Sequence, residues 1–142
     1  MNKNFVAWND SYSVGFDLID NQHKKLVKMV NTLFSYCELG DLNADIAYLD
    51  IINSAMEYAK THFSDEEKYM RLAGYPKLEK HIKEHKSFVA EIVKSVKLFE
   101  TGKETPVNMA KFLKRWLLKH IAVSDKKYAP YLERLNVYKI CA

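Results

Sequence analysis

The chain contains little glycine, proline or cysteine: among its 142 residues there are only four, three and two of them. So few glycines and prolines do not resemble the composition of a disordered or low-complexity chain. Neither Cys37 nor Cys141 lies in a Cys-x-x-Cys arrangement or at a spacing typical of metal ligands. We therefore expect two reduced thiols in a reducing compartment, and the sequence indicates no role for either of them.

Long apolar runs are also missing. No segment stays apolar long enough for a signal peptide or a membrane span, so we expect a cytoplasmic protein without membrane contact. The formal net charge is +4, and basic residues alternate with acidic ones along the whole chain, with only short runs such as Lys24-Lys25. Nucleic-acid binding needs basic residues gathered on one face. We therefore predict no nucleic-acid partner.

The few glycines and prolines mark the ends of helices. Gly40, Gly74 and Gly102 each follow a long periodic segment, where glycine commonly ends a helix in the left-handed conformation. Thr105-Pro106 is typical of an N-cap followed by proline at the first helical position. The predicted helices cover about 18–38, 44–72, 77–101 and 106–135.

Short linkers between these helices favour antiparallel neighbours. The whole chain, 1–142, is therefore predicted to be one all-α domain. It begins with an arm over 1–16, continues as an up-down-up-down four-helix bundle over about 17–135, and ends in a short C-terminal tail.

Polar residues interrupt the apolar stripes of these helices. All five histidines and one carboxylate fall on or beside the stripes: His23, His62, Glu66, His81, His85 and His120. Burying a carboxylate costs several kcal/mol unless charge or hydrogen bonds offset it, and no Lys or Arg occupies a core-facing position beside Glu66. A bound cation would solve this problem.

The spacing of these residues favours metal binding over isolated core histidines. A single histidine such as His23 is more often a satisfied core residue than a ligand. However, His62 and Glu66, like His81 and His85, are four residues apart and share a helix face. Five imidazoles and two carboxylates, counting Asp125, are too many for one ion but fit two. Nitrogen-rich ligation suits iron, copper or zinc better than magnesium or calcium.

Asp125 follows His120 by five positions, which rotates a regular helix by about 500° and would separate the two side chains. For both to reach one centre, the last helix must end, kink or loosen, and Val123-Ser124 is a plausible place. Asp125 could instead cap a second short helix, and both roles can hold together. Ferritin-like centres use Glu-x-x-His pairs, and the chain contains no such pair.

Three motifs carry a resemblance: His62-x-x-x-Glu66, His81-x-x-x-His85 and His120-x-x-x-x-Asp125. Each is weak alone, but together they are highly specific. They follow a segment from Val14 to His23, and no ligand position is substituted. From about residue 5 to residue 132 the chain resembles the hemerythrin family, in particular its single-domain bacterial members.

The resemblance implies a centre of two iron ions (Fe2+/Fe3+) with a bridging oxo or hydroxo group. His81, His85 and His120 would bind one iron, which is then saturated, while His23 and His62 would bind the other and leave a position open for dioxygen. Glu66 and Asp125 would bridge both irons. By resemblance, Leu117 and Trp116 line an apolar dioxygen pocket.

Phe63 and Ile121 neighbour ligands in sequence and could contribute to that pocket, although ordinary core packing explains them equally well. The expected function is reversible dioxygen binding, for storage, transport or delivery, and not enzymatic catalysis. One alternative is a di-iron enzyme that reduces nitric oxide, peroxide or dioxygen, which would need a reductant path and a proton donor. The other is an oxygen-sensing module. A protein partner is not indicated.

Overall fold

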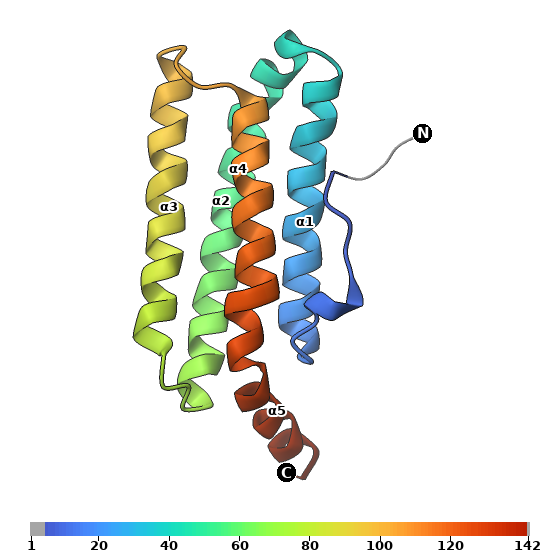
Figure 1. Ribbon diagram of the computed structural model, residues 1–142, viewed down its shortest axis with the longest axis vertical. Coiled ribbons are helices and arrows are strands. Elements are labelled where there is room, and N and C mark those ends of the chain that lie inside the picture. Colours follow the sequence, from blue (N-terminus) through green and yellow to red (C-terminus); the bar gives the residue numbers. More distant parts are fainter. Residues whose placement is uncertain (1–4, 142) are drawn as a thin grey trace.

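A computed structural model describes the backbone of residues 5–141 and the side chains of residues 5–134. Its elements, in chain order, are η1 (Asp10–Tyr12), α1 (Asp17–Glu38), α2 (Asp41–Leu72), α3 (Leu78–Glu100), α4 (Pro106–Lys119), η2 (His120–Asp125) and α5 (Lys126–Cys141). Helices α1 to α4 form an antiparallel bundle, α5 continues α4 at its lower end, and the N-terminal arm runs along α1 (Figure 1). The predicted four-helix bundle is confirmed.

Glycine ends α2 as the sequence predicts. Gly74 has a φ of +71°, a left-handed conformation that side chains with a Cβ rarely adopt. Its N–H donates to the carbonyl of Arg71 at 3.1 Å, and the N–H of Tyr75 donates to that of Met70 at 3.0 Å. The side chains of Tyr75 and Met70 then pack in one apolar cluster. This Schellman arrangement satisfies the last carbonyls of α2 and turns the chain sharply into α3.

Two helix boundaries differ from the prediction by more than one residue. Helix α2 begins at Asp41, directly after Gly40, and not near residue 44. The end predicted near residue 135 is too early, because α5 continues to Cys141 and its last six residues contain neither glycine nor proline to stop it. The side chain of Cys141 lies outside the described residues, and Cys37 is half-buried.

Two apolar clusters fill the interior. The large cluster extends from the middle of the bundle to its upper end and includes Leu33, Tyr48, Phe63 and Leu117. The small cluster lies at the lower end; its buried members are Val14, Phe16, Ile19, Met70, Tyr75, Tyr128, Ala129 and Leu132. Along the helices, the histidines and carboxylates singled out above fall between these clusters. We call this band of buried polar side chains the polar layer.

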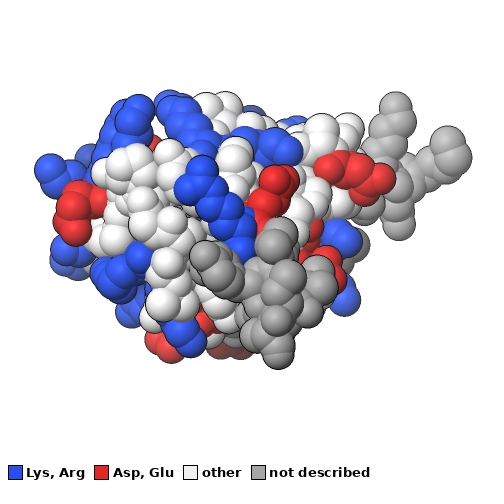
Figure 2. Space-filling model, turned by 90° about the horizontal axis from the view of Figure 1, so that it is seen from below, with Lys and Arg blue, Asp and Glu red and all other residues white. Residues whose placement is uncertain are grey.

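Charges on the outside are mixed. Figure 2 shows basic side chains around the lower end of the molecule with acidic side chains between them. Within the described part of the chain, no helix is both long and apolar enough to cross a membrane.

Candidate metal centre

The fold brings all seven predicted ligands together in the polar layer. His23 comes from α1, His62 and Glu66 from α2, His81 and His85 from α3. The remaining two, His120 and Asp125, stand at the two ends of η2. None of the seven is more than 3 % exposed. Their ligand atoms form two groups, one of Glu66 with His81, His85 and His120, the other of Glu66 with His23, His62 and Asp125.

The two carboxylates reach both groups of histidines. Glu66 Oε1 lies 2.8 Å from His81 Nε2 and 2.9 Å from His85 Nε2, whereas its Oε2 lies 3.2 Å from His62 Nε2. Asp125 is placed in the same way: its Oδ1 lies 3.0 Å from His81 Nε2, and its Oδ2 lies 2.8 Å from His23 Nε2. Each carboxylate therefore presents one oxygen to the group of three histidines and the other to the group of two.

A widened turn places His120 and Asp125 on the same side of the chain. Residues His120–Asp125 are π-helical, and π-helical hydrogen bonds join residues five apart. The loosening expected near Val123-Ser124 thus spreads over the whole segment. The capping role considered for Asp125 is not supported, because neither of its oxygens accepts a hydrogen bond from the residues the structure describes.

Several buried polar atoms of this layer lack a partner that suits them. Among the described residues, His23 Nε2, His62 Nε2 and both oxygens of Asp125 make no hydrogen bond of acceptable geometry. His85 Nε2 and His120 Nε2 face each other at 3.2 Å. An imidazole nitrogen that binds a metal carries a lone pair, so in that form neither nitrogen can donate a hydrogen bond to the other. Unsatisfied buried groups cost about 1–3 kcal/mol each. Bound cations would satisfy all of them at once, so these residues fit a metal centre.

A comparison with protein-family models identifies the family of this chain. The family model described as the hemerythrin HHE cation binding domain matches residues 14–132, which is most of the chain. This chain belongs to the hemerythrin family. The resemblance inferred from the three motifs is confirmed, and the two buried groups of possible ligands are consistent with a binuclear site.

Individual hemerythrin relatives agree. A bacteriohemerythrin of Pseudomonas paraeruginosa is 33 % identical over 123 residues, covering 87 % of this chain and 78 % of the relative. A bacteriohemerythrin of Clostridium acetobutylicum is 33 % identical over 126 residues, covering 86 % and 97 %. A crystal structure of wild-type hemerythrin superimposes with a TM-score of 0.80 at 28 % identity, covering 90 % of this chain and 98 % of that one.

Without metal, the buried groups of this hemerythrin centre influence one another's protonation. Burial disfavours the protonated form of His23 and His81, but the neighbouring Asp125 and Glu66 outweigh it and raise the pKa of each histidine to about 9. Burial also opposes ionisation of Glu66, yet the surrounding histidines hold its pKa well below the usual range. The pKa of His62 is lowered, chiefly by burial. The protons that the metal-free layer takes up compete with metal ions for the same nitrogens.

Other residues orient the ligands, and the sequence prediction did not include them. Gln22 Oε1 lies 2.7 Å from His62 Nδ1, and Glu67 Oε2 lies 2.7 Å from His85 Nδ1. The hydroxyl of Tyr128 donates to Glu66 Oε2 at 2.9 Å. Such outer hydrogen bonds fix the tautomer and the direction of a metal-binding imidazole. One signal was available: Gln22 lies three residues after Ile19 and four before Leu26, on the apolar stripe.

Glu84 is a fourth residue of this kind. Its Oε2 lies 3.7 Å from His120 Nδ1. The nearby His120 imidazole outweighs partial burial and lowers the pKa of Glu84 to about 2. The carboxylate is therefore charged at neutral pH and faces the ring nitrogen of His120 that points away from the centre.

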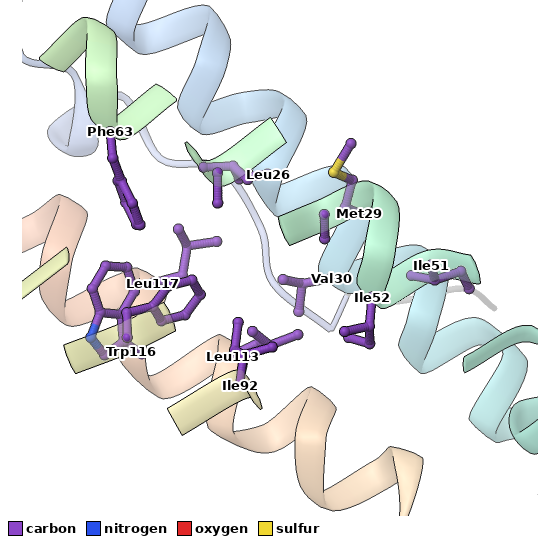
Figure 3. A pocket seen from close by; sticks show the side chains of 13 residues that line it. Leu26, Met29, Val30, Ile51, Ile52, Phe63, Ile92, Leu113, Trp116 and Leu117 are labelled. Carbon is purple, nitrogen blue, oxygen red and sulfur yellow. The ribbon is translucent and has the colours of Figure 1, made fainter. Parts of the chain in front are cut away.

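An apolar cavity of about 30 Å³ adjoins the polar layer. Phe63, Trp116 and Leu117 line it, and Figure 3 shows them together at one end, with Met29, Ile51 and Ile52 toward the other. Ile121 is fully buried in the large apolar cluster but does not line the cavity. The ring of Phe63 stacks on His85 with centroids 3.9 Å apart, so the cavity wall directly touches a predicted ligand.

Proposed function

We propose that this hemerythrin holds two iron ions in the polar layer and binds dioxygen reversibly at one of them. The observation that carries the proposal is the unequal division of nitrogen ligands between two sites joined by two carboxylates. We propose iron rather than copper or zinc for two reasons. The nitrogen and carboxylate ligands suit iron, and the chain belongs to the hemerythrin family.

Ligand number decides which site stays open. His81, His85 and His120 would hold one iron, with an oxygen from each of Glu66 and Asp125 and a bridging oxo or hydroxo group, and would complete six positions there. His23 and His62, with the other two oxygens and the same bridging group, would fill five positions at the second iron. The sixth position there is where dioxygen would bind. The two ferrous ions would supply the electrons that dioxygen takes up on binding.

The surrounding side chains keep water and protons away from that position. Leu117 and Phe63 are each 5 % exposed, and they form the cavity wall nearest the centre together with half-buried Trp116. An apolar enclosure of this kind prolongs the life of a bound, partly reduced ligand because no proton donor reaches it. Ile121 is a fully buried core residue and is not part of this wall. In this proposal the protein is a carrier or store of dioxygen and not an enzyme.

The test is the absorption spectrum of the aerobic protein, combined with metal analysis, through repeated cycles of deoxygenation and re-aeration. The proposal expects two irons per chain and a ligand-to-iron charge-transfer band that bleaches and returns. Two irons with a band that decays after one exposure would favour an enzyme that reduces dioxygen, peroxide or nitric oxide. A folded protein that binds no iron would rule out the di-iron proposal.

A further inference from the structure

A hollow of about 350 Å³ lies on the outside of the bundle where α3 passes the end of α4 and η2. It is lined by Lys80, Lys83, Glu84, Ser87, Trp116, Lys119, His120 and Ser124. It is separate from the apolar cavity, but the two share Trp116, which forms part of both walls. The hollow brings the molecular surface to within one side chain of the candidate metal centre.

Two aromatic rings connect the hollow with the centre. The Trp116 ring stacks on the His120 imidazole, with centroids 4.4 Å apart and planes 14° from parallel. Trp116 is half-buried, whereas His120 is 3 % exposed and directs its Nε2 at Glu66 and Asp125. An electron that arrives at the hollow would therefore reach an iron ligand through one stacked pair, without crossing a saturated side chain.

The rim of the hollow is positively charged. Lys80, Lys83 and Lys119 are all exposed, and the one carboxylate in the lining, Glu84, is half-buried and faces His120. Figure 2 shows basic side chains on the side of the molecule that α3 forms, at the left, with acidic side chains between them. Because a positive rim attracts and orients negatively charged partners, it favours an acidic protein over a basic or neutral one.

We propose that this hollow docks a small acidic one-electron carrier protein, and that Trp116 and His120 conduct its electrons to the oxidised centre. Each reduced carrier gives up one electron and leaves oxidised. Two such deliveries convert both ferric ions to ferrous ions, the state that can bind dioxygen. The electron-transfer step rests on the proposed di-iron function, whereas docking rests on the lysines and the shape of the hollow.

The chain offers a matched pair of variants to test docking. In the first, Lys80, Lys83 and Lys119 are all changed to Glu. In the second, the same change is made at Lys94, Lys97 and Lys103, three exposed lysines that line a different hollow on the far half of α3. Both variants change the net charge equally, so any difference between them reports position and not total charge.

The probe is an acidic [2Fe–2S] ferredoxin at low ionic strength. Its oxidised form is titrated into the diferric protein by calorimetry, and its reduced form is mixed with the diferric protein while reduction of the centre is followed by absorption. Charge steering changes association rates by about 10–10³-fold. We expect binding at least about tenfold weaker and reduction at least about tenfold slower in the Lys80/Lys83/Lys119 variant, but changes under about threefold in the control.

The outcomes separate docking from dioxygen binding. If both variants bind the ferredoxin equally, or if added salt does not weaken binding, the docking proposal is overturned. Both variants should keep the parent's oxygenation cycle, because all six lysines are exposed and none is a candidate ligand. A parent that docks ferredoxin through these lysines but never oxygenates reversibly would overturn the proposed function while leaving the docking surface intact.

Discussion

Helix α2 contains two stretches that are equally buried and chemically opposite. Near its start, Tyr48 and Ile52 are 0 % and 2 % exposed and belong to the large apolar cluster. Near its end, His62 and Glu66 are 1 % and 0 % exposed and belong to the polar layer. Apolar contacts stabilise the first stretch without help. The polar side chains of the second stretch are costly to bury unless bound metal ions interact with them. The two stretches are therefore equally buried but stabilised in different ways.

The largest effect should follow from removing the carboxylate shared by both sites. We expect Glu66→Ala to abolish the binuclear centre, because the oxygens of Glu66 face both groups of histidines. Iron analysis of the purified protein measures this. The neighbouring Glu67→Ala removes only the partner of His85 Nδ1, so it should keep two irons at about 10–100-fold lower affinity. A Glu66→Ala protein with two tightly bound irons would contradict the assignment.

Removing iron from the parent should loosen one region more than the other. We expect amide hydrogen exchange around His62, His81 and Asp125 to accelerate on the order of 10³-fold, because ion binding stabilises only the folded arrangement. Exchange around Tyr48 and Ile52 should change much less. Hydrogen-exchange mass spectrometry of the iron-loaded and iron-free proteins gives the comparison. Uniform acceleration along α2 would show that the two stretches are one cooperative unit.

Shortening a side chain of the large apolar cluster should lower stability without affecting iron binding. Leu33 is 0 % exposed in the large apolar cluster, and we expect Leu33→Ala to lower the free energy of unfolding by about 3 kcal/mol while two irons remain bound. Chemical denaturation measures the loss. Leu39, which is 67 % exposed, provides the control, since Leu39→Ala should change stability little. Loss of iron in Leu33→Ala would mean that the large cluster also positions the ligands.

Two tyrosine hydroxyls allow a smaller comparison. The Tyr128 hydroxyl bonds to Glu66, so Tyr128→Phe should destabilise the iron-loaded protein by about 1.5–3 kcal/mol. The Tyr48 hydroxyl is buried and has no hydrogen-bond partner among the described residues. Tyr48→Phe should therefore be neutral or stabilising. Denaturation midpoints of both variants test this, and equal losses would contradict the proposed difference between the two regions.

The smallest effect should come from the apolar cavity, which lies where the large apolar cluster meets the polar layer. We expect Leu117→Ala to speed autoxidation several-fold without loss of iron, because it thins the apolar cover beside the centre. Leu113 lines the same cavity and loses the same atoms in Leu113→Ala, but this variant should keep the parent's oxygenated lifetime. The decay of the charge-transfer band in air measures both. An unchanged lifetime in Leu117→Ala would remove Leu117 from the dioxygen pocket.

The sequence by itself determined the helices and the types of the candidate ligands. Helical geometry places residues four apart on one face, so spacing alone pairs His62 with Glu66 and His81 with His85. Glycine and proline are rare enough to show where the chain turns, and the left-handed Gly74 confirms one such turn. The sequence does not indicate the end of α5, because no glycine or proline marks it.

Only the tertiary structure decided which atoms of different helices face one another. That Gln22 supports His62, that Tyr128 bonds to Glu66, and that lysines of α3 and α4 share one hollow all depend on the rotation of neighbouring helices. Sequence spacing fixes positions within one helix but not the packing between helices. The same limit applies to η2: the sequence required a distortion between His120 and Asp125, but its spread over a whole π-helical turn emerged only in the folded bundle, where both ends reach one centre.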